Sequence, residues 1–285
     1  MLLLLAAAET IPLGLDLYLP VPEENPLTAE KIELGRRLFF DRRLSRDGSV
    51  ACASCHDPER GYFGRARRGR RRFASKGRRN APALVNRGYG RLFFWDGRVA
   101  TLEEQVLKPI EDPNEMDLTV AEAASRAGLA PEEISRALAS FVRSILSGDS
   151  RYDRFVNGDR AALSAEEQAG LQLFRGKANC VACHVGPNFT DERLHNTGIA
   201  WRDGEFADVG AGQGNFKTPT LREVARTAPY MHDGSLALLE DAIEYYDRGG
   251  NANPLLDSEL HPLHLSSDEK RSLVQFLRSL SGPPL

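Results

Sequence analysis

The sequence predicts a mainly α-helical protein built from two similar units, and three observations lead to this prediction. The motif C-x-x-C-H occurs twice, as residues 52–56 and 180–184, and the two copies contain all four cysteines of the chain. Similar helical patterns of apolar residues surround each copy, whereas strand patterns are sparse. The length of 285 residues suits two domains. One helical unit with one motif is therefore expected to occur twice.

The motif itself is the attachment signature of a c-type haem. Its two thiols bond to the haem vinyl groups, and the adjacent His becomes the proximal ligand of the iron. A redox disulfide and half of a zinc site are the other interpretations of a C-x-x-C pair. Neither accounts for a His after the second Cys in both copies. The sequence therefore predicts two covalent haems, held by Cys52, Cys55 and His56 and by Cys180, Cys183 and His184.

A helix is predicted before each motif. Residues 35–39 read GRRLF and precede the first copy, and residues 170–174 read GLQLF and precede the second. Ser164 and Glu167 have the spacing of a capping box ahead of the second of these helices. The similarity of the two segments favours duplication of one unit.

A second amphipathic helix is predicted after each motif, through residues 139–148 and 274–282. Ser266 and Glu269 are spaced as a capping box for the later helix, and Gly282 with two prolines ends it. The apolar residues at helical spacing are Leu138, Phe141, Val142 and Ile145, and Leu273, Phe276, Leu277 and Leu280. Each unit is therefore predicted to consist of a helix, the haem motif, loops and a second helix, in that order.

The domain boundary is expected near residues 147–159, which are polar and contain two Gly. This division predicts an N-terminal domain over residues 9–150 and a C-terminal domain over residues 151–285. The opening MLLLLAAAET resembles the end of a signal peptide without a basic start, so residues 1–8 are interpreted as a signal-peptide remnant. No stretch has the length of a membrane span. Because bacteria attach haem covalently outside the cytoplasmic membrane, a soluble periplasmic protein is expected.

Residues 65–79 are rich in Arg and Lys, although the chain has a net charge of −3. Nucleic-acid binding is disfavoured, because the run is a single loop with no accompanying binding fold. A solvated loop near the haem propionates and a docking patch for an acidic redox partner both remain as interpretations.

The sixth position of each haem iron decides its function, because a strong protein ligand favours electron transfer and an open site favours chemistry. No His lies between His56 and His184, and Met116 is the single Met within the first domain. The first haem is therefore a candidate for an open, reactive iron.

These motifs belong to a larger ordered set that includes LGRRLFFDRRLS, RNAPALVN, FFWDGRVATLEEQVLKPIEDPNEM, FKTPTLREVARTAPYMHDGS and YYDRGG. In this set the chain resembles the bacterial di-haem cytochrome c peroxidase family, and within it the MauG-like branch, from about Asn25 to Leu280. The resemblance implies two cytochrome c-like helical domains, each with one covalently bound c-type haem. It also implies a peroxide-reactive haem in the first domain, an electron-transfer haem in the second, and a calcium ion between them.

The resemblance assigns catalytic roles to four residues. Trp95 matches a relay between the haems, although the bare sequence would favour a core aromatic at this position. Glu115 matches the acid–base carboxylate that moves a proton between the two peroxide oxygens. Gln105 and Pro109 match the lining of the distal pocket. Without the resemblance, the acidic loop around Glu115 would be read as solvated surface.

The resemblance also implies a calcium site and a role for two His residues. The calcium ligands would be the Asn80 side chain and the backbone carbonyls of Thr227 and Pro229, an all-oxygen set that suits this hard ion. His195 and His232 lie in family motifs and are interpreted as structural or propionate-binding.

Two departures from the ordinary peroxidases of the family are expected. These enzymes usually carry a distal His on the first haem, which this chain lacks, so the first haem should be open without prior reduction. They also carry a Met on the second haem, where this chain has Tyr246, fourteen residues after His232. Tyr246 shares an apolar helix face that Tyr245 does not. The residues of that face are Leu239, Ala242, Ile243 and Tyr246. The alternative is that Tyr246 only packs in this face.

The resemblance thus implies a hydrogen peroxide-dependent di-haem oxidoreductase. It would form a high-valent di-haem state and oxidise a periplasmic protein substrate or a small redox protein. An ordinary di-haem cytochrome c peroxidase, reduced by a small cytochrome or cupredoxin, is the first alternative, and a non-catalytic di-haem electron carrier is the second. No nucleic acid and no membrane span are expected, and the protein would be a monomer or homodimer.

Overall fold

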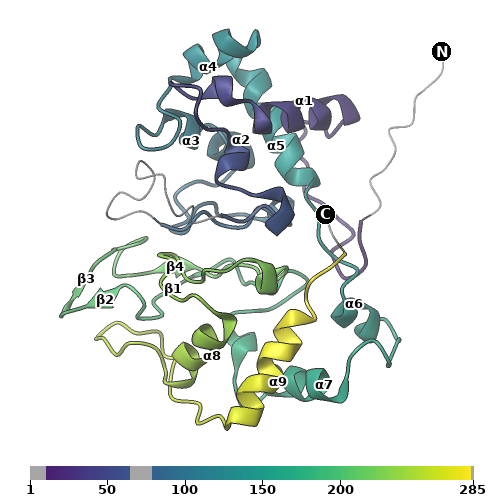
Figure 1. The fold of residues 1–285 in the computed structure, drawn as a ribbon, viewed down its shortest axis with the longest axis vertical. Coiled ribbons are helices and arrows are strands. Elements are labelled where there is room, and N and C mark those ends of the chain that lie inside the picture. The colour runs from purple at the N-terminus through teal and green to yellow at the C-terminus, as the bar shows by residue number, and fades with distance from the viewer. Residues whose placement is uncertain (1–10, 65–78, 284–285) are drawn as a thin grey trace.

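The computed structural model describes residues 11–64 and 79–283, and its helices form two groups around two hydrophobic cores (Figure 1). The first group consists of α1 (Ala29–Phe40), α2 (Leu102–Gln105), α3 (Lys108–Glu111), α4 (Val120–Ala127) and α5 (Pro131–Ser144). The second group consists of α6 (Arg151–Val156), α7 (Ala165–Arg175), α8 (Leu239–Asp247) and α9 (Ser267–Arg278). The prediction of a mainly α-helical fold is confirmed.

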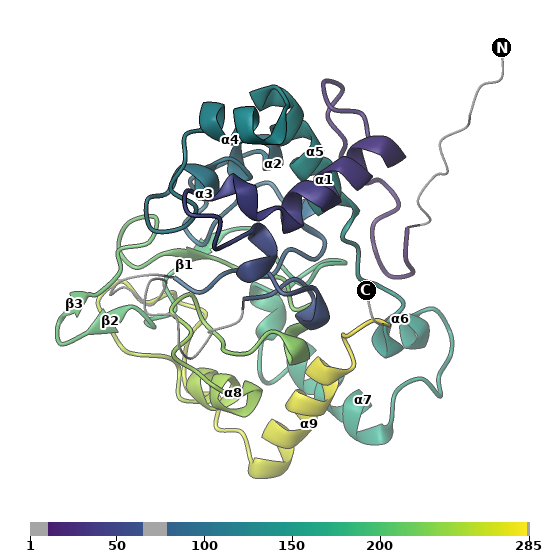
Figure 2. The same cartoon turned by 45° about the horizontal axis from the view of Figure 1, so that its top comes forward.

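The two halves repeat one helix pair, in which α1 packs on α5 and α7 packs on α9 (Figure 2). Gly35 of α1 lies against the carbonyl of Ala137, and Gly170 of α7 lies in the same way against the carbonyl of Ser272. A Cβ atom at either glycine would lie within 2.0 Å of the opposing carbonyl oxygen. Glycine therefore allows both pairs to cross closely.

The apolar positions expected in these helices are buried, and the expected helix caps are present. The Ser164 side chain accepts a hydrogen bond from the Glu167 backbone N–H, and Ser266 accepts one from Glu269. The buried apolar residues are Leu138, Phe141, Val142 and Ile145 in the first half, and Leu273, Phe276, Leu277 and Leu280 in the second. Burial of these faces against the partner helix stabilises each pair, at about 25 cal/mol per Å² of apolar surface.

The segment between the two cores is partly helical. Helix α6 begins directly after Ser150, whose side chain accepts a hydrogen bond from the backbone N–H of Asp153. The N-terminal segment also crosses this junction, because the Asp149 N–H donates to the Leu13 carbonyl and buried Arg222 donates to the Gly14 carbonyl. The two cores fall on either side of residue 150, and the exact domain division stays a prediction.

The strands in the described part of the chain are short and form two antiparallel pairs in the second half (Figure 1). Strand β1 (Leu194–His195) pairs with β4 (Phe216–Lys217), with Leu194 opposite Lys217. Strand β2 (Trp201–Arg202) pairs with β3 (Glu205–Phe206), with Trp201 opposite Phe206.

Two expectations concern residues that the structure does not describe. The proposed signal-peptide remnant, residues 1–8, lies outside the described residues, and so does the Arg-rich run except for Arg79. Within residues 11–64 and 79–283, none of the helices combines the length and apolar character that crossing a membrane requires.

Candidate functional site

A cavity of about 1750 Å³ lies between the two halves and is lined by parts of both C-x-x-C-H motifs. Ordinary small-molecule pockets measure about 300–1,000 Å³. The cavity is therefore large enough for two sizeable prosthetic groups, one beside each motif.

The two motifs adopt the same local conformation. In the first, Cys52–Ser54 forms a 3₁₀ turn, and the His56 N–H donates to the Cys52 carbonyl at 2.9 Å. In the second, Cys180–Ala182 forms the same turn, and the His184 N–H donates to the Cys180 carbonyl at 2.9 Å. Each turn therefore brings the His close to the first Cys of its motif.

Both motif histidines are oriented as iron ligands should be. The Nδ1 atom of His56 lies 3.3 Å from the Tyr62 carbonyl oxygen, and that of His184 lies 2.8 Å from the Phe189 carbonyl oxygen. Such a contact leaves Nε2 available for a metal. Burial lowers the pKa of His56 to about 4 and also lowers that of His184, so both rings are neutral, as ligation requires.

The cysteines also fit covalent haem. Cys55, Cys180 and Cys183 line the cavity, and Cys52 packs against the first core. Burial raises the pKa of Cys52 and of Cys180 to about 12, so these thiols carry no charge into the apolar wall. Thioether bonds to a haem would remove these buried polar hydrogens altogether.

His232 places one further buried polar atom, its ring nitrogen Nδ1, in the cavity wall. His232 is buried, and its ring stacks on Phe216 with 3.8 Å between ring centroids. Its Nδ1 atom has no hydrogen-bond partner among the described residues, and its Nε2 atom lies 3.7 Å from Asp208. An unpaired buried nitrogen is costly in the protein alone. A polar group of a bound prosthetic group would relieve that cost.

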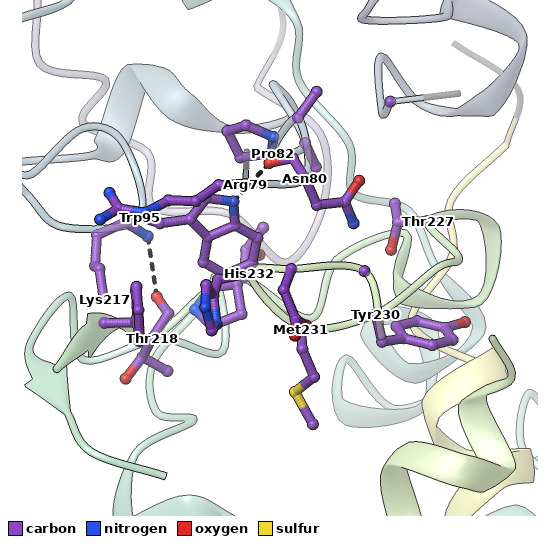
Figure 3. A pocket seen from close by; sticks show the side chains of 18 of the residues that line it. Arg79, Asn80, Pro82, Trp95, Lys217, Thr218, Thr227, Tyr230, Met231 and His232 are labelled. Atoms are coloured by element: carbon purple, nitrogen blue, oxygen red, sulfur yellow. Dashed lines mark hydrogen bonds between the residues drawn. The ribbon is translucent and has the colours of Figure 1, made fainter. Parts of the chain in front are cut away.

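Trp95 lies in the cavity wall between the two halves (Figure 3). Its indole Nε1–H donates to the Asn80 carbonyl oxygen at 2.7 Å, and its own carbonyl accepts from the backbone N–H of Lys217 at 2.7 Å. These bonds connect Trp95 to both halves. Its position is compatible with a relay, and the role stays a prediction.

The predicted distal residues of the first haem come together in the cavity. Glu115, Gln105 and Pro109 line its wall, as does His56. A tight turn holds Glu115, whose N–H donates to the Asp112 carbonyl at 2.9 Å. The acid–base role of Glu115 stays a prediction, but the loop that carries it is part of the cavity wall.

Met116, the single Met within residues 9–150, is only 4% exposed and packs in the first core. It is not among the cavity-lining residues, and within the described part of the first half His56 is the single His or Met that lines the cavity. This arrangement agrees with an open first haem.

The two tyrosines of α8 have different surroundings. The Tyr245 hydroxyl donates to the Thr197 carbonyl at 2.8 Å and accepts from the Asn251 N–H at 3.1 Å. Tyr246 lines the cavity, as does His184, and burial strongly raises the pKa of its phenol. Leu239, Ala242 and Ile243, which share its helix face, line the cavity too. Iron ligation by Tyr246 stays a prediction.

The three residues expected to bind calcium, Asn80, Thr227 and Pro229, all line the cavity, and Figure 3 shows two of them, Asn80 and Thr227. The Asn80 side-chain amide donates to the Pro229 carbonyl oxygen at 2.7 Å, and Thr227 lines the same region. The set supplies an amide and two backbone carbonyls, which is the oxygen chemistry that calcium prefers. Calcium binding by these residues stays a prediction.

His195, expected to be structural or propionate-binding, lies between two carboxylates. Its Nδ1 atom lies 2.5 Å from Asp257 and its Nε2 atom 2.9 Å from Asp191. The neighbouring Cys183 sulfur and these carboxylates raise its pKa to about 10. His195 thus links the loop that carries Asp257 to Asp191, which follows the second motif.

Sequence reasoning missed a buried charge cluster that joins the halves. Glu192 accepts from Arg87 at 2.7 Å and from the backbone N–H groups of Arg91 and Leu92, while Lys217 lies 3.7 Å away. Despite its burial, these cations lower the pKa of Glu192 to about 2. Lys217 lies in the motif FKTPTLREVARTAPYMHDGS, but neither that motif nor helical spacing pairs it with Arg87 and Glu192, which are 105 positions apart in the chain.

The comparisons with known proteins agree with this geometry. The family model described as di-haem cytochrome c peroxidase matches residues 29–131. The chain is 41% identical to methylamine utilization protein MauG of Methylorubrum extorquens, over 93% of this chain and 82% of the relative. It is 36% identical to cytochrome-c peroxidase IdrP1 of Denitromonas iodatirespirans, over 95% of this chain and 86% of the relative.

A solved structure has the same fold. It is the crystal structure of a MauG-like protein associated with microbial copper homeostasis, which matches with a TM-score of 0.83 and 33% identity over 94% of each chain. The prediction of two cytochrome c-like domains is thereby confirmed. The matching motifs, the paired haem sites and these relatives show that the chain is a di-haem peroxidase with two c-type haems, and that it belongs to the MauG-like branch of the di-haem cytochrome c peroxidase family.

Proposed function

We propose that this peroxidase uses hydrogen peroxide to oxidise a protein substrate or a redox partner, and that it stores two oxidising equivalents across its two haems before doing so. The observation that carries this proposal is Tyr246 in the cavity wall beside the second motif. An anionic oxygen ligand favours oxidised iron, whereas a thioether favours reduced iron. A tyrosine ligand would therefore suit storage of oxidising equivalents better than rapid supply of electrons.

The bound haems supply the redox chemistry of iron, and the residues of the chain control peroxide and its protons. Glu115 takes the proton from the inner oxygen of peroxide and delivers it to the outer oxygen, which leaves as water. Gln105 and Pro109 border the same space and limit how peroxide can lie. Among the described residues of the first half, His56 is the single His that lines the cavity. No second His would therefore occupy the space beside Glu115 where peroxide would bind.

Trp95 carries charge between the two sites. Its indole N–H is held by the Asn80 carbonyl, and its backbone is held by Lys217, so the ring keeps one orientation in the wall. A fixed aromatic ring between two redox groups needs little rearrangement when it gains or loses an electron. This rigidity supports a relay role.

Calcium would stabilise the same region. Asn80 joins Trp95 to the proposed ion site, since its backbone carbonyl binds the indole and its side chain contacts Pro229. Removing the ion with a chelator should loosen Trp95 and change its fluorescence, and added calcium should restore it. An unchanged fluorescence in a sample shown to have contained calcium would remove the ion from this site.

The way in which c-type haem is attached indicates the cellular compartment of the protein, and the compartment in turn limits its partners. Covalent c-type haem is attached outside the cytoplasmic membrane in bacteria, so we place the protein in the periplasm. Its partner there would be a small secreted protein that either donates electrons or is itself modified by oxidation.

An ordinary cytochrome c peroxidase is the competing function, because relatives with that name match the chain over most of its length. The experiment is to add stoichiometric peroxide to the haem-loaded protein without a donor and to follow its optical spectrum. A two-equivalent oxidised state that persists and then oxidises a protein from the same gene neighbourhood supports the proposal. Efficient steady turnover with a reduced small cytochrome, without such a persistent state, supports the ordinary peroxidase.

A further inference from the structure

Lys217 is a buried amine in the cavity wall with few partners. Its side chain is 9% exposed. The amine donates to the Thr218 carbonyl at 3.1 Å, and the nearest Glu192 oxygen lies 3.7 Å away, beyond ordinary hydrogen-bond reach. An ammonium group carries three donors. Thr218 therefore satisfies only part of what a charged Lys217 can offer.

The carboxylates around Lys217 are already engaged by other cations. Glu192 accepts two hydrogen bonds from Arg87 and two from backbone N–H groups. Asp191 contacts His195, which also contacts Asp257. Burial, followed by the charge of Arg87, lowers the pKa of Lys217 to about 7. Among the described residues, no carboxylate is thus dedicated to this amine.

The cavity that Lys217 lines is the place where such a carboxylate would enter. Figure 3 shows the amine extended beside Trp95, with its bond to Thr218 drawn. The residue is on β4, directly opposite Leu194 of β1. The next residue of β1, His195, lies 3.9 Å from the Cys183 sulfur that would hold the second haem. The Thr218 carbonyl that accepts from the Lys217 amine also accepts from the hydroxyl of Thr190, six residues after His184 of the second motif. Lys217 is therefore on the second-haem side of the cavity.

We propose that Lys217 is a positioning residue for the second haem, and that it forms an ion pair with one of the haem propionates. A propionate is a carboxylate on a flexible arm that enters with the haem, so it would complete the donors of Lys217 without disturbing Glu192. The Lys217 backbone N–H already holds Trp95. One residue would then orient both the haem edge and the aromatic ring next to it.

This ion pair has an electrostatic consequence. A positive charge near a haem stabilises the reduced state of its iron relative to the oxidised state, because the reduced state carries one unit less positive charge. Removing the charge should therefore lower the reduction potential of the second haem. The first haem should change less, because Lys217 lies on the second-haem side of the cavity.

The first test is a redox titration of the haem-loaded protein, with Lys217→Met compared with wild type. The expected result is a lower potential for the second haem in Lys217→Met. Lys217→Arg, which keeps the charge, should stay closer to wild type. Lys177→Met is the matched control, because Lys177 is an exposed lysine paired with Glu269. An unchanged second potential in Lys217→Met, or an equal fall in Lys177→Met, would overturn the proposal.

The second test needs no variant and decides the matter if Lys217→Met does not fold. A crystal structure of the wild-type haem-loaded protein should place the Lys217 amine within about 3.2 Å of a propionate oxygen of the second haem. The ion pair would be refuted if the amine kept its hydrogen bond to Thr218 and its place near Glu192 while both propionates of that haem lay out of its reach. Neither measurement depends on peroxidase activity, so a failure here leaves the proposed function standing.

Discussion

Tyr245 and Tyr246 are neighbours on α8, yet they face different environments. The Tyr245 hydroxyl donates to the Thr197 carbonyl and accepts from the Asn251 N–H, whereas Tyr246 lines the cavity. Successive residues of an α-helix point about 100° apart, so one helix can anchor a loop with the first tyrosine and face the haem site with the second. The pair offers a direct comparison between a structural phenol and a candidate ligand.

Replacing Tyr246 by Met should raise the reduction potential of the second haem. A thioether favours reduced iron and a phenolate favours oxidised iron. Met has good helix propensity, so α8 should persist. The variant should keep its reaction with peroxide at the first haem but lose the persistent two-equivalent oxidised state. Redox titration and optical spectra of the haem-loaded proteins measure both effects.

Tyr245→Phe is the control for this experiment. It removes the hydroxyl that bonds Thr197 and Asn251, which should cost about 1–3 kcal/mol of stability and leave the potential of the second haem in place. If Tyr246→Met leaves that potential unshifted, Tyr246 is not the ligand, and the ordinary peroxidase becomes the better proposal.

Glu115→Gln should retain both haems and slow the reaction with peroxide by about 10² to 10⁴. The change is nearly isosteric and removes the acid–base function without removing the side chain from the cavity wall. Stopped-flow mixing with peroxide measures the rate. Glu111→Gln, an exposed residue at the end of α3, is the matched control and should react like wild type. Rates within a few-fold of wild type for Glu115→Gln would exclude this residue from the proton transfer.

The oxidised protein should contain one high-spin and one low-spin haem. Within the described residues of the first half, His56 is the single His or Met of the cavity wall, so the first iron should be five-coordinate or weakly bound by water. The second iron should be low-spin, with His184 and Tyr246 as its ligands. Electron paramagnetic resonance distinguishes the two states. A spectrum with low-spin signals alone would contradict an open first haem.

Glu192 should make the stability of the protein depend on acid pH. Its pKa falls from an ordinary value of 4.5 to about 2 because Arg87 and Lys217 favour its ionised form. This shift corresponds to about 3 kcal/mol of stability. The contribution is present above pH 4.5 and is lost as the pH falls through about 2.

Urea unfolding at a series of pH values tests this expectation with Glu192→Gln. The variant should be less stable than wild type at neutral pH, and the difference should shrink as the pH falls below 4.5. Glu166→Gln serves as the control, because Glu166 forms an exposed ion pair with Arg271. A difference between wild type and Glu192→Gln that stays constant down to pH 3 would show that Glu192 is not held ionised by its neighbours.

The two helix crossings should respond alike to enlargement of their glycines. Gly35→Ala would place a methyl group 1.9 Å from the Ala137 carbonyl oxygen, and Gly170→Ala would place one 2.0 Å from that of Ser272. Each helix pair must then separate, at a cost of about 1–3 kcal/mol. Thermal unfolding should show a lowered Tm for both variants, whereas Glu33→Ala, exposed on the same helix as Gly35, should leave the Tm nearly unchanged. Unchanged stability in both glycine variants would show that the crossings are not close.

The repeated motifs and their flanking helices could be read from the sequence because they are local patterns. A C-x-x-C-H segment makes its own turn, and an apolar face at helical spacing specifies which side of α5 or α9 is buried. The expectation that Tyr246 and Tyr245 lie on different faces of their helix is of the same kind, since it depends only on positions along one helix, whereas the role of Tyr246 as a ligand came from the resemblance. The resemblance to a known family added the residues of the cavity wall, such as Glu115, whose local sequence looks like ordinary solvated surface.

The charge cluster of Arg87, Glu192 and Lys217 could not be found in this way. Its members come from a loop in the first half and from segments in the second half, and they meet only when the halves pack together. The same holds for the contact between Asn80 and Pro229, and for the N-terminal segment that reaches Arg222. The buried face of a helix appears in the sequence as apolar residues that recur every three or four positions. A contact between distant loops produces no such repeating pattern. Tertiary packing therefore decided which charges line the cavity and which ones join the two halves.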